Sequence, residues 1–141
     1  MKKITNGKKI LDQMLKVRNS YPADVLKSRE ILAREAPEYL ELFHKTYLYV
    51  LNERSALSPK IKELIIIAAD SMQFYERGLR SHMTSALKLG ATRDEIVDTL
   101  LTASIAGGIH VLSVALPIFD EVIHAWEKNQ GKASQAGKVK K

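Results

Sequence analysis

The segment from Glu63 to Gly90 constrains this chain more than any other part of its sequence. Apolar residues recur there with helical spacing, which predicts two successive helices, the second running from about Tyr75 to Leu89. The same spacing places Glu63 on the inner face of the first helix and His82 on the inner face of the second. A carboxylate and an imidazole on such faces can exchange protons, so this segment is the first candidate for a functional site.

The ends of these helices carry residues with known capping behaviour. Ser58 can cap the first helix, and Pro59 fits its first position. Gly90 can adopt the left-handed conformation that ends the second helix. Thr92 and Glu95 have the spacing of a capping box, which starts the next helix.

Helical periodicity continues through the rest of the chain, and no segment shows the alternation typical of a strand. The further predicted helices are Lys8–Val17, Asp24 (as a cap) to Glu35, Pro37–Leu51, Thr92–Ala106 and Ile109–Lys128. The residues Asn19-Ser20-Tyr21-Pro22 should separate the first two, and Pro117 should bend the last. The sequence therefore predicts an all-α fold of about seven helices.

Composition limits the class of protein. With 141 residues and 45% apolar composition, the chain is long enough to bury a core and is expected to form one domain. The absence of cysteine excludes disulfide bonds, thiolate metal ligation and thiol redox catalysis. There is no signal peptide and no apolar run of about 18 residues, so we expect a cytoplasmic protein without a membrane partner.

The net charge of +6 is concentrated at the two ends of the chain. Residues 1–19 carry six Lys or Arg and one Asp, and residues 128–141 carry five Lys and no acid. Acids outnumber bases between these ends, so no basic stripe is expected on the folded helices, which argues against nucleic-acid binding. We predict a basic N-terminal helix or arm over 1–19, a helical domain over 20–128 and a disordered basic tail over 129–141.

A set of residues spaced across three helices resembles a known family. The set consists of Lys62-Glu63-Leu64, His82, Ala86-Leu87, Gly90-Ala91-Thr92, Glu95-Ile96 and Ala106-Gly107. It resembles the carboxymuconolactone decarboxylase family, which also includes the alkylhydroperoxidase D-like proteins, over roughly residues 30–127. The resemblance implies an all-helical domain that assembles into a homo-oligomer, either a trimer or a hexamer.

The resemblance also distinguishes two chemistries. The peroxidase branch has a Cys-x-x-Cys-x-x-x-His motif, and here the two cysteine positions hold Tyr75 and Gly78, while the histidine is His82. Because a thiolate is the nucleophile that attacks a peroxide, this chain is not a thiol peroxidase. The decarboxylase branch has a Glu-x-x-Leu-x-x-His pattern across this turn, and this chain resembles it at Glu76, Leu79 and His82. It implies a small carboxylated lactone as substrate, loss of carbon dioxide and no cofactor.

His82 is the first candidate for the proton donor of such a reaction. An imidazole can give or take a proton near neutral pH, and His82 shares a helix face with apolar residues such as Leu79 and Ala86. From spacing alone, a buried histidine that hydrogen-bonds to a backbone carbonyl is the simpler interpretation. The resemblance favours the catalytic one.

Glu63 and Tyr75 are the candidate partners of His82. Glu63 shares a face with Asp70 and can orient the imidazole or relay its proton, as carboxylates do in other sites. The alternative is a first-turn glutamate that the helix dipole favours. Tyr75 is expected to line the pocket and to donate from its hydroxyl group. Asp70 is interpreted as an acid that caps the next turn.

Two arginines on the same helix are candidates for binding a substrate carboxylate. Glu76 and Arg80 have the spacing of a surface ion pair. Arg77 and Arg80 lie on the side of the helix away from His82, so either one would reach a substrate across a subunit boundary, where bidentate pairing suits a carboxylate. The alternative for Glu76, Arg77 and Arg80 is an ordinary solvated face.

A second anion-binding candidate follows Gly107 and Gly108. These glycines permit a close approach, and the amides at the start of the next helix favour an anion beside His110. The alternative is a plain turn followed by a surface histidine. His110 and His124 are four helical turns apart and cannot share a metal ion, so we expect no metal site. The resemblance implies that no organic cofactor is needed either.

Together these features predict a cofactor-free carboxy-lyase, or a related lyase or isomerase, acting on a small carboxylated lactone or ring acid. The alternative is a non-catalytic oligomeric protein of the same fold that binds small anions. A nucleic-acid accessory protein that uses the basic ends is a third possibility. The apolar helices at 61–69 and 109–126 carry more hydrophobic surface than a monomer readily hides, which supports a homo-oligomer.

Overall fold

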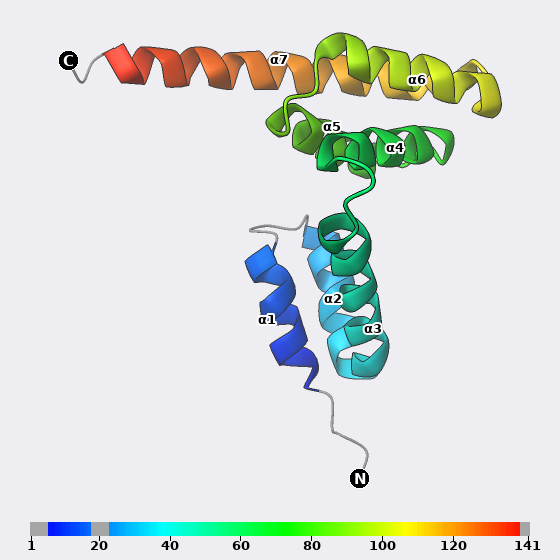
Figure 1. The fold of residues 1–141 in the computed structure, drawn as a ribbon, viewed down its shortest axis with the longest axis vertical. Coiled ribbons are helices and arrows are strands. Elements are labelled where there is room, and N and C mark those ends of the chain that lie inside the picture. The colour runs from blue at the N-terminus through cyan, green and yellow to red at the C-terminus, as the bar shows by residue number, and fades with distance from the viewer. Residues whose placement is uncertain (1–5, 18–22, 139–141) are drawn as a thin grey trace. The chain divides into compact units, whose positions relative to one another are not determined.

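The computed structural model describes residues 6–17 and 23–138, and all of its regular structure there is helical (Figure 1). The helices are α1 (Gly7–Val17), α2 (Ala23–Glu35), α3 (Pro37–Leu48), α4 (Pro59–Met72), α5 (Glu76–Lys88), α6 (Arg93–Gly107) and α7 (His110–Lys138), with a π-helical turn at Tyr49–Glu53. The predicted all-α fold is confirmed over these residues. The chain divides into two compact units, one on each side of the Ala56–Leu57 bond.

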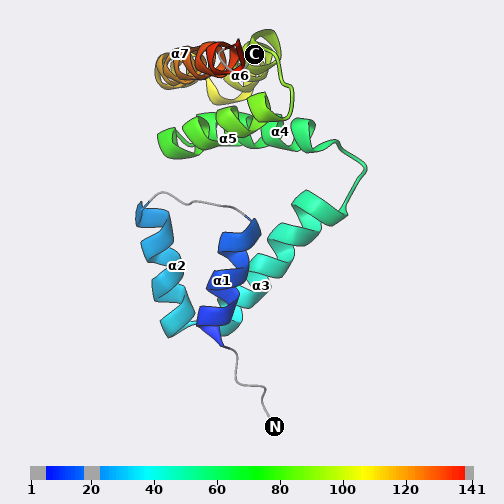
Figure 2. The ribbon, with the colours of Figure 1, turned by 90° about the vertical axis from the view of Figure 1, so that its left-hand side faces the viewer.

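The first unit contains α1, α2 and α3, which lie side by side (Figure 2). Its small core consists of Ile10 and Met14 from α1 with Leu40 from α3. His44 on α3 is also buried, and burial lowers the pKa of this imidazole because the charged form loses its hydration. The apolar stripe predicted on this helix is only partly internal, since Tyr39 is 60% exposed.

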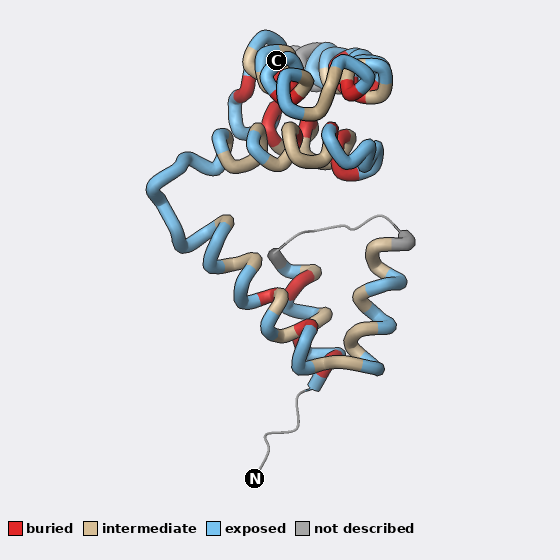
Figure 3. Tube along the Cα trace, turned by 90° about the vertical axis from the view of Figure 1, so that its right-hand side faces the viewer, coloured by how far each residue is buried: buried red, intermediate tan, exposed pale blue. Residues whose placement is uncertain are grey.

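The second unit contains α4, α5, α6 and α7 and carries the larger core. α4 packs against both α5 and α6, and these two helices in turn pack against α7. Buried residues lie on the sides of the helices that face one another (Figure 3). The completely buried side chains of this core include Ile67, Leu79, Met83, Ile96 and Leu100. The spacing of four residues from Leu79 to Met83 and from Ile96 to Leu100 is the helical apolar periodicity seen in the sequence.

The predicted caps of the second unit are confirmed. The Ser58 hydroxyl accepts a hydrogen bond from the Ile61 amide at 3.3 Å, at the start of α4. Thr92 and Glu95 form the reciprocal capping box of α6, at 3.1 and 2.8 Å. Gly90 has a φ of +84°, the left-handed conformation expected after the end of α5.

Glu95 also accepts a hydrogen bond from Lys60 at 2.7 Å, which links the first turns of α4 and α6. This lysine and the Thr92 amide lower the pKa of the Glu95 carboxyl, since both favour its ionised form.

Several predicted boundaries are wrong. α2 begins at Ala23, so Asp24 lies in its first turn and is not its cap. α7 continues through Pro117 and extends to Lys138, beyond the predicted end at Lys128 and into the segment 129–141 that was expected to be disordered. The helix break predicted at 19–22 lies outside the described residues. The structure forms two compact units, divided after Ala56, and the predicted domain limits at 19 and 128 stay predictions.

Large apolar side chains are exposed on the second unit. Ile105 near the end of α6 is 88% exposed, and Ile109 in the following turn is 81% exposed. Ile61 and Ile65 on α4 are about half exposed. A homo-oligomer that covers these residues stays a prediction. Within the described ranges, no helix combines the length and apolar character needed to cross a membrane.

Thr92→Ala tests the capping box that starts α6. The variant should lose about 1 kcal/mol in free energy of unfolding, because the amide at the third helical position loses its acceptor. Urea unfolding followed by the fluorescence of Trp126, the chain's one tryptophan, measures this loss, since Trp126 packs against the same core. Thr102→Ala, at an exposed position inside α6, is the matched control. Equal losses in the two variants would contradict the capping role.

A candidate acid-base site between α4 and α5

His82 and Glu63 meet between α4 and α5, as the sequence suggested. His82 lies on α5 between the completely buried Leu79 and Ala86, and Glu63 lies near the start of α4. The Nδ1 atom of His82 is 2.7 Å from Oε2 of Glu63. The two side chains are only 18% and 16% exposed, so solvent screens their interaction weakly. The interpretation of His82 as a histidine held by a backbone carbonyl does not fit this contact.

This hydrogen bond selects the chemical form of the imidazole. When Glu63 is ionised, its carboxylate accepts a hydrogen bond from Nδ1–H of His82, so Nε2 of the neutral ring carries the lone pair. The same carboxylate stabilises the positive charge when Nε2 takes up a proton. The pair can therefore accept a proton at Nε2 and return it, with the ring held in one orientation.

Asp70 is the third ionisable residue of this site, and the sequence interpretation of it was wrong. It lies two turns after Glu63 on α4 and does not cap α5, whose cap residue is Tyr75 without a side-chain hydrogen bond. Its Oδ2 atom is buried and has no hydrogen-bond partner among the described residues. Burial raises the pKa of the Asp70 carboxyl, while His82 lowers it and Glu63 raises it. The spacing of seven residues from Glu63 was the sequence signal for this position.

Gly78 makes the space that Asp70 occupies. A Cβ atom built on Gly78 would lie 2.1 Å from Oδ2 of Asp70 and 2.4 Å from Cδ1 of Tyr75. Real Cβ atoms do not approach other atoms so closely, so the absence of a side chain at this position lets the carboxyl group lie directly against the backbone of α5. Gly78 is one turn before His82, which places Asp70 beside the same face of the helix.

The turn between α4 and α5 contains Phe74 and Tyr75, which follow Asp70 closely in the chain. Phe74 has a φ of +53°, and the Tyr75 amide donates to the Asp70 carbonyl at 2.9 Å. Tyr75 itself is 46% exposed, so only part of its ring is available to line a pocket. Its role as a hydroxyl donor stays a prediction.

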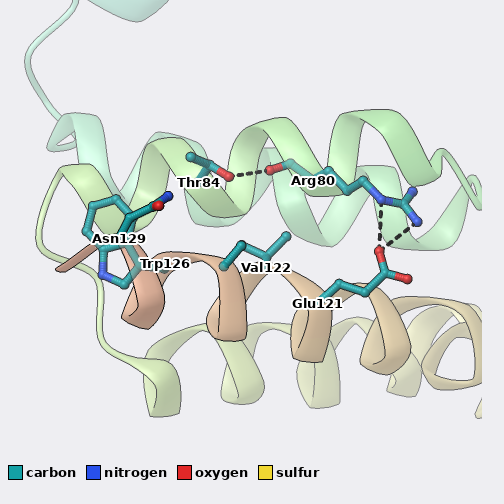
Figure 4. Close-up of a pocket in the computed structure, with 7 residues that line it drawn as sticks. Arg80, Thr84, Glu121, Val122, Trp126 and Asn129 are labelled. Carbon is teal, nitrogen blue, oxygen red and sulfur yellow. Dashed lines mark hydrogen bonds and ion pairs between the residues drawn. The ribbon is translucent and has the colours of Figure 1, made fainter. Parts of the chain in front are cut away.

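The structure places Arg80 away from His82. Arg80 lies in a groove of about 340 Å³ between α5 and α7, where it pairs with Glu76 at 3.1 Å and Glu121 at 3.0 Å (Figure 4). These two carboxylates raise the pKa of its guanidinium. His82 contacts α4 instead, so one chain does not bring Arg80 and His82 into a common pocket. Glu76 takes part in the predicted ion pair, and Arg77 is exposed on the same helix.

His110 and the two glycines form a separate contact at the start of α7. The His110 ring stacks on Phe74 with centroids 5.6 Å apart. Gly108 has a φ of +87° and lies against this ring, and a Cβ on Gly107 would lie 2.8 Å from Met72. The glycines therefore permit close packing near the turn between α4 and α5. Anion binding there stays a prediction. In the described part of the chain, no three His, Asp or Glu side chains converge as ligands for a metal ion.

Comparison with known proteins identifies the family to which this chain belongs. The model of the carboxymuconolactone decarboxylase family matches residues 37–121, which is more than half of the chain and includes Glu63, Asp70 and His82. The chain belongs to this family. Among curated proteins, none matches it.

A solved structure shares the fold. The crystal structure of a presumed carboxymuconolactone decarboxylase from Burkholderia xenovorans LB400 matches with a TM-score of 0.75 at 20% sequence identity. The match covers 89% of this chain and 98% of that protein. At this identity the likeness shows a shared helical architecture.

Gly78→Ala tests the space made for Asp70. The new methyl group should displace the Asp70 carboxyl and lower the free energy of unfolding by about 1–3 kcal/mol. The control is Gly131→Ala in α7, where a Cβ meets no atom within 4 Å and helix propensity should stabilise the chain. Urea unfolding should also show that Gly78→Ala costs less in an Asp70→Ala background. Equal costs in both backgrounds would rule out the steric conflict with Asp70.

Asp70→Asn tests the ionisation of this carboxyl through stability. Because the pKa of Asp70 is raised on folding from its ordinary value of 3.8, wild-type stability should fall as the pH rises from that value through the folded pKa. The variant cannot ionise, so its stability relative to wild type should increase over this interval. Urea midpoints at pH 3 and pH 7 give the comparison, with the exposed Asp98→Asn as control. A wild-type-to-variant difference independent of pH would contradict the raised pKa.

Proposed function

We propose that this protein is a cofactor-free carboxy-lyase, or a related lyase or isomerase, acting on a small carboxylated lactone or ring acid. The observation that carries the proposal is the 2.7 Å contact between His82 and Glu63 in a largely buried position. Membership of the carboxymuconolactone decarboxylase family supports the reaction class. The lack of cysteine removes the thiol peroxidase alternative.

The reaction makes specific demands on the protein. The bond from the ring carbon to the carboxylate breaks, carbon dioxide leaves, and the electron pair moves into the conjugated lactone carbonyl. A proton must then be delivered to carbon, so that one carboxylate and one proton give one C–H bond and carbon dioxide. In this proposal His82 supplies the proton from Nε2 and Glu63 stabilises the imidazolium form.

The other candidate residues have supporting parts in the proposal. Tyr75 lines the pocket and donates to the developing oxyanion, and His110 with Gly107 and Gly108 gives a second donor. Arg77 or Arg80 binds the substrate carboxylate from a neighbouring subunit in a cytoplasmic trimer or hexamer. The exposed Ile105 and Ile109 support such an assembly, because burying them removes apolar surface from water.

His82→Ala tests the function directly. Loss of 4-carboxymuconolactone absorbance, followed with wild type and variant at equal concentrations, should show turnover by the wild type and a fall of about 100-fold or more in the variant, as expected for a lost proton donor. His124→Ala is the matched control, because His124 is exposed on α7 and bonds only to Asp120 among the described residues. This variant should retain wild-type turnover.

The remaining outcomes distinguish the alternatives. Turnover that survives His82→Ala unchanged would exclude the proposed mechanism. No turnover by wild type, combined with thermal stabilisation by small carboxylates, would favour the non-catalytic anion-binding protein. Removal of residues 1–8 and 129–141 tests the nucleic-acid alternative, since intact turnover in the shortened chain would exclude a function that resides in the basic ends.

A further inference from the structure

We propose that Asp70 is a positioning residue of this site, a second carboxyl group that lies against Gly78 and controls the charge on His82. The inference rests on the proposed function for its catalytic consequence. The contacts of Asp70 are independent of that function. Asp70 is not among the site residues expected from the sequence. Its place in the site is set by the contact between α4 and Gly78 of α5.

Two carboxyl groups of α4 lie against the face of α5 that carries His82, one bonded to the imidazole and one packed one turn away. Glu63 and Asp70 are two turns apart on the inner face of α4, and Glu63 bonds directly to the imidazole. Asp70 reaches the same face of α5 because Gly78, one turn before His82, offers no side chain. Replacing Gly78 by any other residue would place a Cβ 2.1 Å from the Asp70 oxygen. The space is therefore specific to this pair of residues.

The surroundings of Asp70 favour the protonated form of its carboxyl group. Its Oδ2 atom is buried without a hydrogen-bond partner among the described residues, and an ionised carboxylate is costly in such a place. The charged groups that act on it are His82 from α5 and Glu63 from its own helix. On α6, Glu95 is occupied with Lys60 at the other end of α4, and on α7, His110 stacks on Phe74.

The charge of Asp70 affects the balance between the neutral and imidazolium forms of His82. An ionised Asp70 stabilises the imidazolium form of His82, in addition to the stabilisation from Glu63, and so preserves the proton that the reaction needs. A protonated Asp70 no longer does so. Because the three groups interact, protons are lost and gained by the cluster as a whole rather than by each residue alone. Asp70 thus acts through His82 and need not touch the substrate.

The first test measures this coupling without any assay of activity. Carboxyl ¹³C NMR of the full chain follows the titration of Asp70 in wild type, Glu63→Gln and His82→Gln. Glu63→Gln should lower the pKa of Asp70 and His82→Gln should raise it, because the neighbouring charge is removed. Asp98→Asn, on α6, should leave the titration unchanged. An Asp70 titration that neither variant moves would overturn the proposal, and either variant alone suffices if the other does not fold.

The second test measures the effect on the reaction. Asp70→Asn keeps the shape of the side chain, so a purely structural role predicts an unchanged pH profile. The proposal predicts that the alkaline limb of kcat/KM moves to lower pH, because the imidazolium form loses a stabilising charge. An unmoved profile in an active variant would overturn the proposal.

The two tests separate this inference from the proposed function. If wild type fails to turn over the lactone while the Asp70 titration responds to Glu63→Gln and His82→Gln, the proposed function fails and the coupled cluster stands. If His82→Ala abolishes turnover while neither substitution moves the Asp70 titration, the proposed function stands and the inference about Asp70 fails.

Discussion

Complete burial of Leu79, Met83 and Ala86 holds α5 against its neighbours, and the geometry of the site depends on that packing. His82 lies within the same stretch of helix, so it cannot turn toward solvent without exposing this apolar face. The imidazole must therefore find a polar partner inside the helix pair, and Glu63 provides it at 2.7 Å. The hydrogen bond between His82 and Glu63 offsets the cost of burying the imidazole, and the same bond holds the ring in an orientation that suits proton transfer. A site of this kind is held by the core rather than by loops.

Local features of the second unit were predictable from sequence because they depend on residues close together in the chain. The Ser58 cap, the Thr92–Glu95 capping box and the left-handed Gly90 each involve contacts within about five residues, and all are present. Periodicity also predicted that Glu63 and His82 lie on facing sides of two helices, because the apolar residues around them show which side of each helix is inward. Whether these two residues are catalytic is a separate question, which their spacing does not answer.

The features that sequence reasoning missed depend on contacts between helices or on helix length. Asp70 carries an ordinary sequence signal for a cap, and only the packing of α4 on α5 shows that it lies against Gly78. The end of α7 was misplaced because residues after Lys128 are polar and lack apolar periodicity, although helix propensity alone can extend a helix that is already formed. The sequence gives no sign of the two compact units, because no Gly-rich or Pro-rich linker lies around Ala56.

The contact between Asp70 and Gly78 also bears on how the chemistry of such a site can change over time. Position 78 corresponds by resemblance to the second cysteine of the peroxidase motif, and any residue with a Cβ there conflicts with the carboxyl of Asp70 where it now lies. A thiol at this position and a carboxyl in this place are therefore mutually exclusive. A cysteine introduced at position 78 would require the carboxyl group of Asp70 to rotate away from its present place or to be removed. The effects of substitutions at positions 70 and 78 should therefore depend on each other.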